Sequence, residues 1–160
     1  SLGVANPFIA PLMAAEMAAR GRNALVFRGS DGLDELTTTG NSEIWLVQGG
    51  EVREFTLNPA DLGLNTADLA QLVGGDAHHN ADVAKKLLAG ERLGNFAAIR
   101  DVVALNAAGG VVAYSLGSNQ IETQADLNAA FATALQKTLT TIDSGDAAQK
   151  LSDWMAASQA

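Results

Sequence analysis

An unbroken apolar run at residues 24–27, ALVF, constrains the fold of this chain more than any other feature. Because the run does not alternate with polar residues, it indicates a strand from residue 24 to about 28 that is buried on both faces, as in a parallel sheet covered by helices. The segment before it, LGVANP, reads as a short strand that leads into a helix. Asn6 is the expected N-cap, Pro7 the first helical residue and Gly21 the end. Strand, helix and strand in this order predict a βαβ unit.

The next segments predict a hairpin followed by helices. The sequences SEIWLV and EVREFTL flank Gly49 and Gly50, which are suited to a tight turn. Thr66, Asp76 and Thr123 are the predicted N-caps of three later helices, and SGD at 144–146 separates the third from a last helix that carries Trp154. The prediction is one α/β domain over residues 1–160, with a central mixed sheet, a βαβ start, a β-hairpin and flanking helices.

Composition excludes several classes of protein. With 48% hydrophobic and 18% charged residues the chain is typical of globular domains. A net charge of −8 and ten basic residues argue against a nucleic-acid surface. The absence of cysteine removes disulfides and thiolate chemistry. No apolar run approaches the roughly 20 residues of a bilayer span, so we expect a soluble protein without a membrane partner.

The loop after the buried strand contains the candidate functional residues. Asp34 and Glu35 are adjacent carboxylates, and carboxylate oxygens suit a hard cation such as Mg²⁺. Gly29 and Gly32 allow a tight turn, and the threonines from Thr37 onward offer hydroxyl groups. From residue types alone, the alternative that both acids are merely solvated stays open.

Within this loop, ALVFRGSDGLDELTTTG resembles the hallmark sequence of anthranilate phosphoribosyltransferases. Further segments resemble the family in the same order: LGVANPFIAPLMAAEMAARG, EVREFTLNPADLGL, GGDAHHNADVAKKLLAGE, IRDVVALNAAGGVVAY and TALQKTLTTIDSGDAAQKLSDWMA. The likeness covers essentially the whole chain. It implies a C-terminal domain of the nucleoside phosphorylase and phosphoribosyltransferase class.

The resemblance also implies an activity. Family members transfer the phosphoribosyl group of phosphoribosyl pyrophosphate to anthranilate, giving phosphoribosylanthranilate and pyrophosphate in tryptophan biosynthesis. It implies a cytoplasmic, homodimeric enzyme that uses Mg²⁺, with Asp34 and Glu35 as metal ligands. No catalytic side chain is expected in this chain, since the chemistry needs no protein nucleophile. Gly32 and Thr37 are candidates for substrate contact.

The chain also departs from the family pattern. It matches only the C-terminal half, lacks the glycine-rich GTGGD-type diphosphate loop, and has Arg28 where many relatives have histidine. The expectation is therefore a fragment or isolated domain that does not turn over substrate by itself, and its oligomeric state is not predicted.

Alternative functions and some prominent residues complete the sequence predictions. A relative of pyrimidine nucleoside phosphorylases is the second enzyme hypothesis, although DGLDE argues against it, and a noncatalytic binding or assembly domain is the third. His78 and His79 are consecutive and point about 100° apart on a helix, which favours a structural or solvated role over metal binding. Asn106 is predicted to bond a backbone carbonyl, and Gly109 and Gly110 to allow close helix contact.

Overall fold

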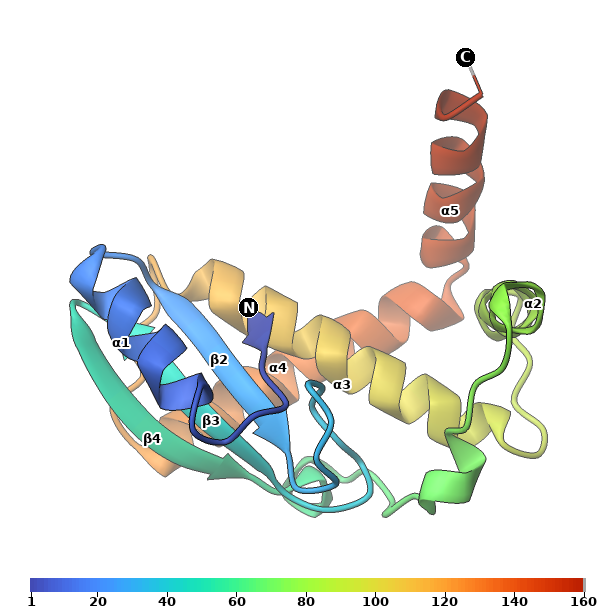
Figure 1. The fold of residues 1–160 in the computed structure, drawn as a ribbon. Helices are drawn as coiled ribbons and strands as arrows, with labels where there is room; N and C mark the ends of the chain where they lie inside the picture. The colour runs from blue at the N-terminus through green and yellow to red at the C-terminus, as the bar shows by residue number, and fades with distance from the viewer. Residues whose placement is uncertain (160) are drawn as a thin grey trace.

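A mixed four-stranded sheet forms one side of the molecule, as the computed structural model of residues 1–159 shows (Figure 1). The strands β1 (Leu2–Gly3), β2 (Ala24–Gly29), β3 (Ser42–Gln48) and β4 (Glu51–Leu57) lie in this order across the sheet. β1 pairs with β2 in parallel, whereas β2–β3 and β3–β4 are antiparallel. The predicted mixed sheet, βαβ start and hairpin are confirmed. The parallel surroundings inferred for β2 are half right, because its other neighbour, β3, is antiparallel.

Helices cover both faces of the sheet, which explains the unbroken apolar run. On one face, α1 (Ala10–Ala19) packs on Val26 and Trp45. On the other, α3 (Phe96–Ser115) and α4 (Gln124–Asp143) pack on Leu25 and Phe27. Since successive strand residues point to opposite faces, the buried positions Leu25, Val26 and Phe27 meet helices in turn on the two faces, and all three are apolar.

α1 begins later than predicted. Asn6 does not cap it; its Oδ1 accepts a hydrogen bond from Phe8 N at 2.9 Å in a preceding turn, and the helix starts at Ala10. Pro11 determines this start, because a proline lacks the N–H that interior helical positions donate, and only the first turn tolerates it.

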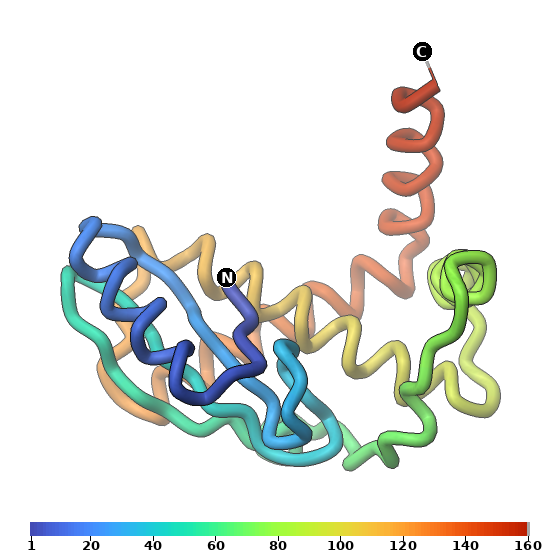
Figure 2. The backbone as a smooth tube through the Cα atoms, in the orientation of Figure 1, coloured from blue at the N-terminus to red at the C-terminus, as the bar shows by residue number. Residues whose placement is uncertain are grey.

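The remaining segments connect and extend these layers. They are the short helices η1 (Pro59–Leu62) and η2 (Leu69–Gln71), then α2 (Ala77–Leu88) and α5 (Asp146–Ala157). Asp76 and Thr123 cap α2 and α4 as predicted. The cap predicted at Thr66 is wrong: the segment forms only η2, and Asp68 caps it. In Figure 2 the backbone of α5 projects away from the sheet, and α2 lies beside the N-terminal half of α3.

α3 is long and apolar enough to cross a membrane, by length and composition alone. Arg100, Asp101 and Asn106 interrupt its apolar residues, so the helix is not the unbroken apolar run whose absence was predicted. The helix buries Ala104, Leu105 and Ala108 against the sheet and α4, which is how the core helix of a globular domain packs.

Candidate functional site

The acidic loop, residues 30–41, joins β2 to β3 and closes on itself at its base. Ser30 N donates to Asn41 O at 2.9 Å, and Gly29 N donates to Leu33 O at 3.1 Å. Gly32 has a φ of +90°, a conformation that favours glycine. The Asp31 carboxylate accepts bonds from Leu33 N at 3.1 Å and from a threonine hydroxyl, so this third acid is used inside the loop.

The threonines stabilise the loop from within. Thr37 is buried, and its Oγ1 accepts a bond from Thr39 N at 2.9 Å and lies 2.9 Å from Thr39 Oγ1. Thr38 is also buried, and its carbonyl accepts from Ala67 N at 3.0 Å. Its hydroxyl has no hydrogen-bond partner among residues 1–159. Substrate contact by Thr37 stays a prediction, and such a contact would compete with the bonds to Thr39.

Asp34 and Glu35 are exposed beside the carboxyl ends of two strands. The loop leaves the end of β2, and at β1 the backbone carbonyl of Asp34 lies so close to Gly3 that a Cβ there would be 1.6 Å from the oxygen. Partial burial raises the pKa of the Glu35 carboxyl, and the neighbouring charge of Asp34 raises it further. A cation bound beside both groups would oppose both effects.

On the other side of the pair, Leu36, the residue that follows Glu35, is hydrogen-bonded to α3. Asn106 Nδ2 donates to Leu36 O at 2.7 Å, and Asn106 Oδ1 accepts from Leu36 N at 2.9 Å. The prediction that Asn106 bonds a backbone carbonyl is confirmed. Gly109 also allows close contact as predicted, since a Cβ there would lie 2.9 Å from Leu36 Cδ1, whereas Gly110 faces open space and the prediction for it is wrong.

The two acids fit a magnesium platform rather than a cage built by the protein. No group of three or more His, Cys, Asp or Glu residues that could hold a metal occurs within residues 1–159. Mg²⁺ commonly keeps several waters and binds one or two carboxylates together with substrate phosphates. Two adjacent, exposed carboxylates on a fixed backbone meet that requirement, so the residues present fit this ion.

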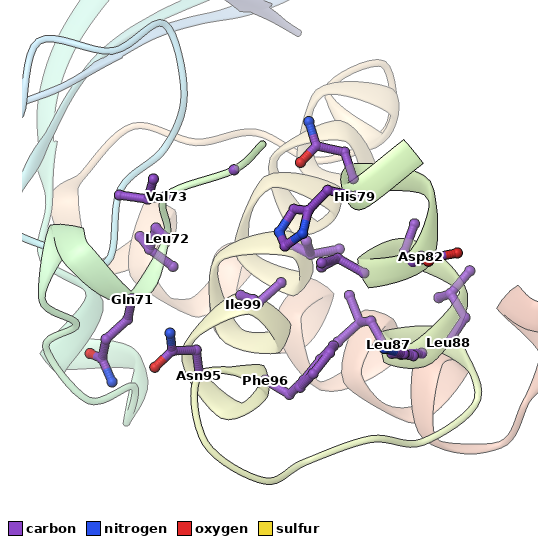
Figure 3. A pocket seen from close by; sticks show the side chains of 16 residues that line it. Gln71, Leu72, Val73, His79, Asp82, Leu87, Leu88, Asn95, Phe96 and Ile99 are labelled. Carbon is purple, nitrogen blue, oxygen red and sulfur yellow. The ribbon is translucent and has the colours of Figure 1, made fainter. Parts of the chain in front are cut away.

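Three hollows in the surface lie away from the acidic pair. One of about 640 Å³ opens between η2, α2 and the first half of α3, and its lining is mainly apolar (Figure 3). His79, Leu87, Phe96 and Ile99 are among the side chains around it, so His79, for which the sequence favours a structural or solvated role, borders a hollow. A second hollow of about 660 Å³ lies between α3 and α4, and a smaller one lies on β3 and β4. None of these is lined by Asp34 or Glu35.

Comparisons with known sequences give consistent matches. The pattern of the glycosyl transferase family, a/b domain, matches residues 1–148. Similar curated proteins are the anthranilate phosphoribosyltransferases of a Nocardioides species, with 46% identity over 98% of this chain and 43% of the relative, and of Acidothermus cellulolyticus, with 45% identity over 100% and 42%. The chain thus spans less than half the length of the curated relatives it matches.

Solved structures show the same likeness. The anthranilate phosphoribosyltransferase of Thermus thermophilus has a TM-score of 0.77 and 30% identity, over 99% of this chain and 42% of that one. The enzyme of Saccharomyces cerevisiae in complex with 4-fluoroanthranilate has a TM-score of 0.74 and 26% identity, over 94% and 40%. A variant of the yeast enzyme with Mg bound has a TM-score of 0.73 and 26% identity, over 94% and 40%.

Proposed function

Because this chain belongs to the glycosyl transferase family with the a/b domain, we propose that the complete protein transfers the phosphoribosyl group of phosphoribosyl pyrophosphate to anthranilate, in tryptophan biosynthesis. The products are phosphoribosylanthranilate and pyrophosphate. The relatives reported above, at 46% and 45% identity, carry the name of this enzyme. Their shared name gives the phosphorylase alternative no support.

In this proposal Asp34 and Glu35 hold Mg²⁺. A divalent cation there supplies charge neutralisation for the diphosphate as it departs. The single observation that carries the assignment is the position of the two adjacent carboxylates, on a loop fixed at the carboxyl ends of β1 and β2, in a chain that aligns with the curated relative over 98% of its length. The yeast relative with Mg bound supports the choice of metal.

The proposal requires no nucleophile from this chain. The anthranilate amine supplies the electron pair of the new N–C1 bond while the C1–O bond to diphosphate breaks, and the amine then loses its proton. Asp34 and Glu35 therefore act as a metal platform and not as an acid–base pair. Gly32 and Thr37 remain candidates for substrate contact. A cytoplasmic location and a homodimer are also part of the proposal, and the absence of cysteine is consistent with a reducing compartment.

The test is a double substitution, Asp34→Asn with Glu35→Gln, in the full-length protein. Removing both carboxylates should raise the Mg²⁺ concentration for half-maximal activity and should lower kcat. We expect the rise to be at least roughly 10–100-fold, because loss of a residue that only supports a metal ligand already has an effect of that size. The circular dichroism spectrum and Tm should stay unchanged, because both side chains are exposed.

The matched control is Asp82→Asn with Glu54→Gln, which removes the same charge from two other exposed positions. It should leave the Mg²⁺ response unchanged. A normal Mg²⁺ response in the Asp34 and Glu35 double variant would refute the metal assignment.

A further inference from the structure

Nothing in the described chain orients the two acidic side chains directly. No hydrogen bond or ion pair to the carboxylate of Asp34 or Glu35 occurs within residues 1–159. Their placement therefore depends on the backbone on either side of them. On one side, Gly3 lies against the Asp34 carbonyl; on the other, Leu36 is attached to α3.

Leu36 is held by both its backbone and its side chain. Asn106 Oδ1 accepts from Leu36 N at 2.9 Å, and Asn106 Nδ2 donates to Leu36 O at 2.7 Å and to Val102 O at 3.0 Å. The side chain of Leu36 is 0% exposed and its Cδ1 occupies the space that a Cβ at Gly109 would need. Residues 106 and 109 are three apart and thus share one face of the helix.

An amide is the side chain suited to this task. Only a group that carries both an acceptor and a donor can satisfy the N–H and the C=O of the same residue at once. The third bond, to Val102 O in the same helix, fixes the orientation of the amide itself. A leucine at 106 would keep the branching at Cγ but leave both backbone groups of Leu36 without these partners.

We propose that Asn106 is a positioning residue: by fixing the peptide that follows Glu35, it sets the geometry in which the carboxylate pair meets a divalent cation. The proposal rests on the proposed function of that pair. It assigns to α3 a role in metal binding without any contact to the metal, although Asn106 lies 70 positions after Leu36 in the chain.

Asn106→Leu in the full-length protein tests the proposal, with Gln48→Met as its matched control. Gln48 also bonds the backbone through its side-chain amide, although to three different residues: its Nε2 donates to Leu116 O at 2.7 Å and to Asn119 O at 2.6 Å, and its Oε1 accepts from Ile121 N at 3.1 Å. Both variants therefore lose side-chain amide bonds to the backbone, but only the bonds of Asn106 hold the acidic loop.

The first readout needs no metal: hydrogen exchange of the Leu36 amide should become faster in Asn106→Leu and stay unchanged in Gln48→Met. The second is the Kd for Mg²⁺ with inorganic pyrophosphate present, measured by titration calorimetry. It should rise about tenfold or more in Asn106→Leu, the effect of losing an outer metal partner, and not in the control. The Mg²⁺ concentration for half-maximal activity should rise in parallel, with no change in KM for anthranilate.

Each result separates the two proposals. If the wild-type protein binds Mg²⁺ and a folded Asn106→Leu variant binds it equally well, the positioning role is overturned while the function stands. If the wild-type protein does not bind Mg²⁺, the proposed function fails, and faster exchange at Leu36 would show a clamp without a metal role. If Asn106→Leu does not fold, Asn106→Ser, which loses reach but adds no bulk, replaces it under the same criteria.

Discussion

Gly3 is the residue whose lack of a side chain most directly shapes the candidate site. An ideal Cβ at this position would lie 1.6 Å from the carbonyl oxygen of Asp34 and 2.7 Å from its carbonyl carbon. These are main-chain atoms, so a rotamer change cannot relieve the overlap. Any side chain at residue 3 must move either β1 or the acidic loop.

We therefore expect Gly3→Ala to lower the free energy of unfolding by about 1–3 kcal/mol, the usual cost of forcing extra volume into a packed site. Gly110→Ala is the control. It lies in α3, is exposed and has no atom within 4 Å of its Cβ position, so it should raise stability by about 0.5–1 kcal/mol through helix propensity. Denaturant unfolding and the NMR shift of the Asp34 amide provide the measurements. A Gly3→Ala variant with wild-type stability and an unshifted Asp34 amide would contradict the expectation.

Three residues of α3 show what the sequence can and cannot predict about single contacts. The hydrogen bond from Asn106 to a backbone carbonyl and the close contact at Gly109 were predictable. A polar side chain on an apolar helix face needs a hydrogen-bond partner, and a glycine there leaves room for a neighbouring segment. Their common partner, Leu36, was not predictable, because helical periodicity defines a buried face without identifying the distant segment that packs on it. Gly110 illustrates the same limit, since it is adjacent to Gly109 in the sequence but faces open space.

At the scale of elements, helix starts were predictable where capping is purely local. Thr123 begins α4 through a capping box, in which its hydroxyl accepts from Asp126 N at 3.2 Å and Asp126 bonds back to Thr123 N at 2.9 Å. Thr66 failed as a cap because Asp68, two residues later, forms its own capping box with Gln71 and starts only a short helix. Both Thr66 and Asp68 are suitable N-cap residues, and the sequence alone does not show which of them begins the helix.

A charged cluster joins the end of α4 to the region where α3 begins. The carboxylate of Asp143 accepts bonds from Arg100, with Nε at 3.0 Å and Nη2 also in contact, and from Arg92 Nη2 at 2.8 Å. These bonds to Arg100 and then Arg92 lower the pKa of Asp143 from 3.8 to about 2. The cluster thus connects the end of α4, the first part of α3 and the segment before α3, whose proximity the hydrophobic pattern does not predict.

Asp143→Asn should lower the free energy of unfolding at pH 7 by about 1 kcal/mol or less, since the carboxylate is half exposed and solvent screens its ion pairs. Because the folded state has the lower pKa, the contribution of Asp143 is present above pH 3.8 and is lost as the pH falls toward 2. The difference between wild type and variant, from urea unfolding at several pH values, should shrink over that interval. Asp82→Asn serves as the control, and a difference that stays constant down to pH 2 would disprove this account.

At the scale of the whole molecule, the layers were predictable and the outlying helices were not. The sheet and the helices on its faces follow from apolar runs and periodicity, because burying those residues is the main driving force for their placement. α5 contains no buried residue, and its Trp154 is 72% exposed. With so little apolar area buried, its apolar residues could not indicate where the helix lies.

The open setting of the acidic pair leads to the last prediction. Asp34 and Glu35 are exposed, the hollows described above do not include them, and a diphosphate would approach a chain with net charge −8 and ten basic residues. A cation held by the two carboxylates can neutralise part of the ligand charge, but catalysis also needs groups that orient both substrates.

We therefore expect the 160-residue chain, assayed by itself with saturating Mg²⁺, phosphoribosyl pyrophosphate and anthranilate, to form no phosphoribosylanthranilate above the buffer background. Chromatographic measurement of the product, with the complete protein as the positive control, decides the question. Since the curated relatives reported above are more than twice as long as the segment this chain matches, the missing orienting groups are expected from the rest of such a protein. Turnover by the 160-residue chain at the rate of the complete protein would show instead that the exposed loop and its neighbours are sufficient to orient both substrates.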